Sequence, residues 1–202
     1  MTANDLGLFN PTTRVAGIWD KIISENLDTS LAPSKLVSIL WSRYKYLPEN
    51  ERSNNTNGAI FEMILGYILV IKNIQPFYFQ TQVSFVPNVE FDFVLFDENK
   101  SPWTISAKTS LRERWKQADL ESFALKNVFR NARSFLLNLD EVESGNLNDK
   151  ILNKGALGLE KSVYARSVDF DELIAEMGKI VWNKAPLISA VVKGREINVE
   201  NI

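Results

Sequence analysis

The chain has 202 residues, of which 45% are hydrophobic and 24% charged, a composition typical of a globular protein with a sizeable core. It contains no cysteine and no histidine, which excludes Cys/His zinc sites, Ser-His-Asp triads and histidine-dependent nuclease chemistry. The formal net charge of -2 argues against a non-specific nucleic-acid coat, although carboxylates can offset a local basic groove. A hydrolase with this composition needs a hard metal held by oxygen ligands, with lysine, a carboxylate or water as its base.

Targeting and membrane signals are absent from the sequence pattern. No apolar run approaches the roughly 18 residues that a membrane-spanning helix needs. The first residues, MTANDLGLFN, lack the basic start and apolar middle of a signal peptide. We therefore expect a cytoplasmic protein with no membrane partner, folded as one domain over residues 1–202.

Apolar residues recur at helical spacing through the first third of the chain. The predicted helices span residues 12–26, 33–47 and 59–72. The polar segment 48–58 reads as a turn between the last two. We expect residues 1–50 to form a helical N-terminal region ahead of a catalytic core over residues 58–182.

After residue 76 the pattern changes to strands and one long helix. The predicted strands span residues 77–86, 89–96, 103–108, 133–139, 162–165 and 187–192, with turns at Pro87-Asn88 and 97–100. The predicted helices span residues 111–130 and 169–182. Residues 140–158 are polar and are predicted to be a loop. The fold class is therefore α/β (α+β), with a central mixed sheet flanked by helices and a βαβ crossover through the helix over 111–130.

Asp92 interrupts an otherwise apolar strand, where it shares one face with Glu90 and Val94. A buried carboxylate is costly unless it is paired or binds a cation, so Asp92 is a candidate metal ligand. The alternative is a strand with one solvated face.

Lys108 ends the next predicted strand, on the same side as Ser106. A lysine at a strand end beside a carboxylate suits phosphodiester hydrolysis, because the cation orients the attacking water while the carboxylate holds a metal. The alternative is a solvated lysine. On the following helix Arg114, Gln117 and Glu121 share one face that can look back toward Lys108.

The segment from Ser106 to Glu121, SAKTSLRERWKQADLE, resembles the core of PD-(D/E)xK restriction endonucleases. It is most similar to the branch in which a small residue replaces the acid before the lysine and a glutamate on the next helix supplies the missing carboxylate. The resemblance covers roughly residues 58–139. Two positions depart from the family pattern: Phe91 stands in place of its proline and Ser106 in place of its second acid.

The resemblance implies a restriction-endonuclease-like core and a catalytic site of Asp92, Lys108 and Glu121. Mg2+ would be held by Asp92 and Glu121 with the backbone carbonyl of Ala107, and Lys108 would act on the water. Glu62, on the helix before the sheet, matches an acid that often completes such sites; the alternative is a surface acid.

Basic residues concentrate on and around the helix of Glu121. We predict DNA contacts by Arg112, Arg114, Lys116 and Gln117. Solvated positions are predicted for Lys126 and Arg130, while Arg133 adds to the local positive charge.

The leading hypothesis is a type II restriction endonuclease that cuts double-stranded DNA as a homodimer, leaving 5'-phosphate and 3'-hydroxyl ends. Its genetic partner would be a cognate DNA methyltransferase. Two alternatives stay open: a repair or recombination nuclease of the same fold, and a catalytically inactive DNA-binding protein.

Overall fold

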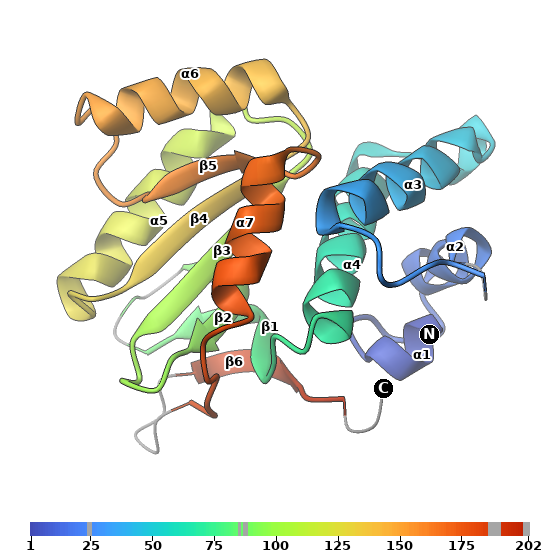
Figure 1. Ribbon diagram of the computed structural model, residues 1–202, viewed down its shortest axis with the longest axis horizontal. Coiled ribbons are helices and arrows are strands. Elements are labelled where there is room, and N and C mark those ends of the chain that lie inside the picture. Colours follow the sequence, from blue (N-terminus) through green and yellow to red (C-terminus); the bar gives the residue numbers. More distant parts are fainter. Residues whose placement is uncertain (24–25, 85, 87–88, 186–190, 200–202) are drawn as a thin grey trace.

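The computed structural model describes residues 1–23, 26–84, 86, 89–185 and 191–199. Six strands form one mixed sheet in the order β5-β4-β3-β2-β1-β6, and helices cover both of its faces (Figure 1). The strands are β1 (Phe77–Val83), β2 (Glu90–Phe96), β3 (Pro102–Lys108), β4 (Arg133–Asn138), β5 (Lys161–Tyr164) and β6 (Val191–Ile197). The helices are α1 (Ala3–Leu6), α2 (Arg14–Ile22), α3 (Pro33–Tyr46), η1 (Glu49–Glu51), α4 (Asn54–Ile71), α5 (Arg114–Val128), α6 (Glu141–Leu152) and α7 (Val168–Met177).

The sheet changes direction at β3. Strands β6, β1, β2 and β3 pair antiparallel, whereas β3, β4 and β5 pair parallel. The parallel pair β3 and β4 is joined by the crossover helix α5, as the sequence predicts. As a result, β3, β4 and β5 all end at the same edge of the sheet.

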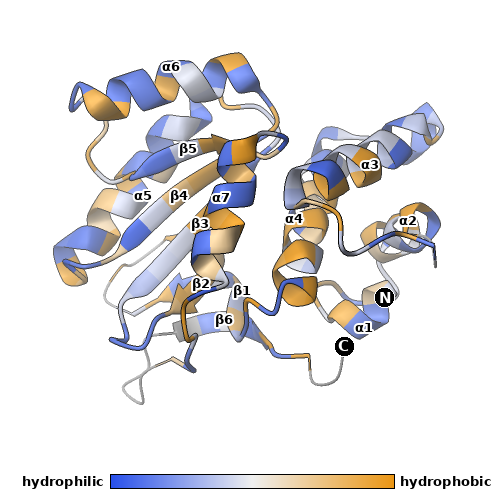
Figure 2. Cartoon of the chain, in the orientation of Figure 1, coloured by the Kyte–Doolittle hydropathy of each residue, from blue (hydrophilic) through white to orange (hydrophobic). Residues whose placement is uncertain are grey.

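The main core lies between the sheet and helix α4, which is buried along most of its length. A helix that is apolar all round belongs in the interior. Figure 2 shows α4 largely in orange, and it contacts the sheet at β3 and the helices α1, α2 and α3 on its other sides. Its first turn is closed by a capping box of Ser53 and Thr56, which explains why the helix begins five residues before the predicted position 59.

Helices α5 and α6 cover the other face of the sheet. Buried Ala118 of α5 and Leu147 of α6 pack in a separate apolar cluster with Leu136 of β4, with Leu159, and with Leu111 just before α5. The two faces of the sheet are thus both filled, which is expected of its parallel half. Within the described residues, no helix combines the length and apolar character needed to cross a membrane.

The prediction of a loop over residues 140–158 is wrong, because α6 occupies most of that segment. Asp140 caps the helix by accepting a hydrogen bond from the Glu143 N–H at 2.9 Å. The sequence is rich in Asn, Asp and Gly, so the helix depends on tertiary contacts: Leu147 is buried, and the Asn148 amide bonds the Ser162 carbonyl of β5 at 2.8 Å. The predicted turn Pro87-Asn88 and residues 187–190 of the last predicted strand lie outside the described residues.

Asp119 fixes α5 to the segment that follows α6. Its buried carboxylate accepts hydrogen bonds from the N–H groups of Leu157, Gly158 and Leu159 at 2.7 to 3.0 Å. Gly158 packs so closely that an added Cβ would overlap backbone atoms of Asp119 and Phe123. This contact sets the position of α5 against the sheet.

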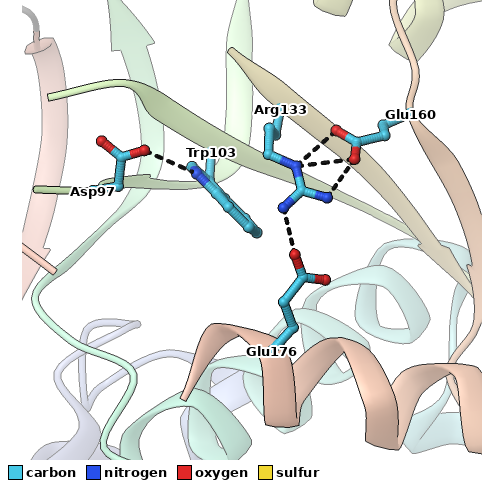
Figure 3. Close-up of polar contacts among 5 residues, drawn as sticks. All are labelled: Asp97, Trp103, Arg133, Glu160 and Glu176. Atoms are coloured by element: carbon cyan, nitrogen blue, oxygen red, sulfur yellow. Dashed lines mark hydrogen bonds and ion pairs between the residues drawn. The ribbon is translucent and has the colours of Figure 1, made fainter. Parts of the chain in front are cut away.

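Arg133 joins three elements at the edge of the sheet opposite the ends of the parallel strands (Figure 3). Its Nε donates to Glu160 at 2.9 Å and its Nη1 to Glu176 of α7 at 2.5 Å. The guanidinium also stacks over Trp103 of β3, 4.0 Å from the ring centroid. Arg133 is therefore a structural clamp, and its charge is not part of a basic surface around α5.

Two glycine substitutions test this packing. Gly145 lies inside α6 with nothing within 4 Å of an added Cβ, so Gly145→Ala should stabilise the protein by about 1 kcal/mol, the usual gain of alanine over glycine inside a helix. Gly158→Ala should destabilise it by roughly 1–3 kcal/mol, because α5 must shift to admit the methyl group. Urea unfolding measures both. Equal effects of the two substitutions would contradict the arrangement of α5 and α6.

Candidate functional site

The site begins where β2 separates from β3. The antiparallel ladder between these strands ends at the pair Phe93 and Ile105, one residue before Asp92 would enter it. The Asp92 side chain replaces the missing backbone acceptor, since its Oδ2 accepts the Ala107 N–H at 2.6 Å. The Asp92 carboxylate within β2 thus satisfies a backbone N–H of β3 that has no acceptor in the β2–β3 ladder.

Lys108 is the last residue of β3, and its Nζ lies 3.0 Å from the same Oδ2 of Asp92. The side chains are 27% and 17% exposed, so the pair is shielded from bulk water yet open at the rim of the sheet. A charge-assisted pair in this setting is stronger than one on an open surface. Asp92, Ala107 and Lys108, predicted from the sequence to act together, are in direct contact.

Glu121 approaches this pair from α5. It accepts a hydrogen bond from Gln117 Nε2 at 2.8 Å, one helical turn earlier. Burial raises the pKa of Glu121, and the Asp92 charge raises it further, while the Gln117 bond and Lys108 lower it. The carboxyl is therefore within electrostatic range of both members of the Asp92–Lys108 pair, as the spacing of the sequence predicts.

Glu62 approaches from α4, on the opposite face of the sheet from α5. Gln80 Nε2 of β1 donates to its Oε2 at 3.2 Å. Burial, reinforced by repulsion from Asp92, raises the pKa of Glu62 to about 8, against the opposing effects of Gln80 and Lys108. Glu62 is thus a partner in the electrostatics of the site and is protonated in large part at neutral pH.

The acids of the site supply the hard oxygen ligands that Mg2+ prefers. A cation among them would also offset the repulsion between Asp92 and Glu62 that raises the pKa of Glu62. In the described part of the chain, no three acidic side chains already lie close enough to form a metal-binding group, and Asp92 is engaged by Lys108. The oxygen donors of Asp92, Glu121 and the Ala107 carbonyl are of the chemical type that would hold a divalent cation.

The predicted DNA-binding residues lie at the start of α5 and in the loop before it. Arg112, Arg114, Lys116 and Gln117 are all exposed on the outer surface. Lys116 pairs with Glu113, which reduces its free charge, and Gln117 bonds Glu121. Among these four residues, Arg112 and Arg114 are therefore the cations that form no ion pair within the described part of the chain.

Three contributors to the site were missed by sequence reasoning. Gln80 bonds Glu62 and has a positive φ of 47°, at the position of β1 that lies across from Asp92. Glu143 of α6 accepts the N–H groups of Leu111 and Arg112 at 2.6 and 3.0 Å and so shapes the loop after Lys108. Asp119 holds α5, and its only signal in the sequence is an acid beside the apolar stripe of that helix.

Comparison of the chain with models of known protein families gave no match, and comparisons with curated proteins and with solved structures also gave none.

Substitution of Glu62 should change stability in a pH-dependent way. Because its pKa is raised from 4.5 to about 8 in the folded chain, deprotonation costs stability as pH rises through that range. Glu62→Gln removes this cost, so the variant should match the wild type near pH 4 and be more stable above pH 8, by on the order of 2 kcal/mol.

Urea unfolding across this pH range measures the difference. Glu98→Gln, in the exposed turn between β2 and β3, is the matched control and should show no such trend. A Glu62→Gln curve parallel to that of the wild type at all pH values would show that Glu62 is not held in a buried, negatively charged setting.

Proposed function

We propose that the protein is a Mg2+-dependent endonuclease that hydrolyses double-stranded DNA with a PD-(D/E)xK-type site. The observation that carries the proposal is the contact of Asp92 with Lys108 and the Ala107 N–H at the point where β2 leaves β3. Glu121 and Glu62, which reach the same charges from opposite faces of the sheet, support it.

Each residue has a distinct role in this proposal. Asp92 and Glu121 hold Mg2+ with the Ala107 carbonyl, and the bound ion supplies positive charge for the phosphoryl group and lowers the pKa of a water. Lys108, released from Asp92, orients the attacking water and neutralises developing negative charge. Glu62 adds a further carboxyl to the site. The oxygen of the attacking water bonds to phosphorus and its proton passes to solvent. The bond between phosphorus and the 3'-oxygen breaks, and that oxygen takes a proton from solvent, which gives 5'-phosphate and 3'-hydroxyl ends.

The finer proposal is a type II restriction enzyme with a restriction-endonuclease-like core. Its substrate is a short symmetric DNA site, which a homodimer matches because both then share a two-fold axis. Arg112 and Arg114 supply DNA contacts next to the site. A cytoplasmic location and a companion methyltransferase accompany this proposal, since host DNA has to be protected.

Cleavage of unmethylated plasmid and phage DNA in Mg2+ tests the proposal. The wild type should give discrete fragments that EDTA abolishes, and Asp92→Ala, Lys108→Ala and Glu121→Ala should each reduce the rate roughly 100-fold or more, as loss of charge stabilisation in a transition state does. Glu98→Ala, at the opposite edge of the sheet, should cut like the wild type.

The proposal fails if the three variants remain folded by circular dichroism and cut as the wild type does. Loss of activity in the Asp92 and Lys108 variants alone would assign the second acid to Glu62 or Glu113. DNA that is bound in Ca2+ but never cut would favour the inactive DNA-binding protein.

A further inference from the structure

A concave feature lies between the C-terminal half of α3 and the chain just after β5. This cavity of about 360 Å3 is lined by Trp41, Ser42, Lys45, Tyr46 and Arg166. Two of these side chains are cationic and two are aromatic, and none is acidic. The lining therefore favours an anion with a flat or apolar neighbour group.

The cations of this cavity lack acidic partners. In the part of the chain that the structure describes, neither Lys45 nor Arg166 forms an ion pair. The Arg166 Nε is fully buried with no hydrogen-bond acceptor, an arrangement that costs free energy. Lys45 Nζ lies over the Trp41 ring, 5.2 Å from its centroid, which positions the charge at the wall of the cavity.

A third cation adds to the positive potential. Arg52, between η1 and α4, is close enough to act on Lys45, and its own Nε is buried without a partner. Among the described residues its ion-pair partner is Glu49, which is 96% exposed and lies 3.9 Å from Nη2. Partial burial lowers the pKa of Lys45, and repulsion from Arg52 and Arg166 lowers it further. An anion in the cavity would relieve this repulsion.

The register of the sheet relates the end of β5, two residues before Arg166, to Lys108 of the candidate active site. Lys108 pairs with Asn138, and Asn138 pairs with Tyr164, so the three residues form one row across β3, β4 and β5. At roughly 4.8 Å per strand, Tyr164 lies about 10 Å from Lys108 along this row. Arg166 follows Tyr164 by two residues at the same edge of the sheet. Its separation from Lys108 therefore corresponds to a few nucleotides along a DNA strand.

We propose that Lys45 and Arg166, assisted by Arg52, bind a phosphate of the DNA backbone next to the phosphodiester that is cut. The inference rests on the proposed function for its source of phosphate. Tyr46, which is 91% exposed at the mouth of the cavity, offers a flat surface for the adjoining sugar or base. The site anchors the strand in register with Lys108 and reads no sequence.

Binding of a labelled mixed-sequence DNA duplex in EDTA, measured by fluorescence anisotropy at several salt concentrations, tests the inference. Lys45→Gln and Arg166→Gln should each weaken binding about tenfold and reduce the slope of log K against log salt by about one. Arg130→Gln removes the same charge at an exposed position before β4, at the opposite edge of the sheet, and should have little effect. Lys45 is exposed on α3, so Lys45→Gln should leave the fold intact. It therefore tests the site even if Arg166→Gln does not fold.

The possible outcomes separate this inference from the proposed function. Wild-type binding that both variants retain in full overturns the phosphate site and leaves the nuclease proposal standing. Absence of wild-type DNA binding and cleavage overturns both. In that case thermal stabilisation by inorganic phosphate, lost in Arg166→Gln, would assign the cavity to a free phosphate ligand instead of DNA.

Discussion

The hydrogen bond from the Ala107 N–H to Asp92 Oδ2 holds β2 and β3 together just beyond the end of their ladder. The same oxygen binds the Lys108 ammonium, so one carboxylate serves both the backbone and the site. Because the strands separate here, the end of β3 opens toward the rim, where α4 and α5 bring Glu62 and Glu121 from opposite faces. The fold thus concentrates acids around a single lysine.

The acids of the candidate site and the cations around Arg166 form two separate groups along this edge of the sheet. Burial, reinforced by repulsion from Asp92, raises the pKa of Glu62 to about 8. On the other side, the buried Nε atoms of Arg52 and Arg166 have no hydrogen-bond partner among the described residues. The acids around Asp92 and the cations around Arg166 both lower the stability of the free protein. A metal ion bound by the acids and a phosphate bound by the cations would remove both costs, and a DNA substrate with its metal supplies both. The net charge of -2 conceals this separation.

Local periodicity predicted most elements, and it placed Asp92 and Lys108 on neighbouring strands, where their side chains are in contact. Helical spacing predicted that Glu121 faces Lys108, and the structure brings its carboxyl within electrostatic range of Lys108 and Asp92, because a crossover helix packs back onto the strands that it joins. Periodicity failed for α6, which contains two Asn and one Gly and depends on the Asp140 cap and on packing against the sheet. Gln80 and Arg166 were missed because their roles depend on contacts between segments far apart in the chain. Arg133 was taken for surface charge, whereas Glu160 and Glu176 bind it.

Calorimetric titration of Mg2+ into the DNA-free protein tests the assignment of the acids most directly, since it needs no knowledge of the DNA target. Wild-type protein and the Glu98→Gln control should bind Mg2+ with the same affinity. Asp92→Asn and Glu121→Gln should each bind Mg2+ at least about tenfold more weakly, because each variant has lost a metal ligand or the group that supports one. Equal binding by all four proteins would place the metal elsewhere and contradict the site built around Asp92 and Lys108.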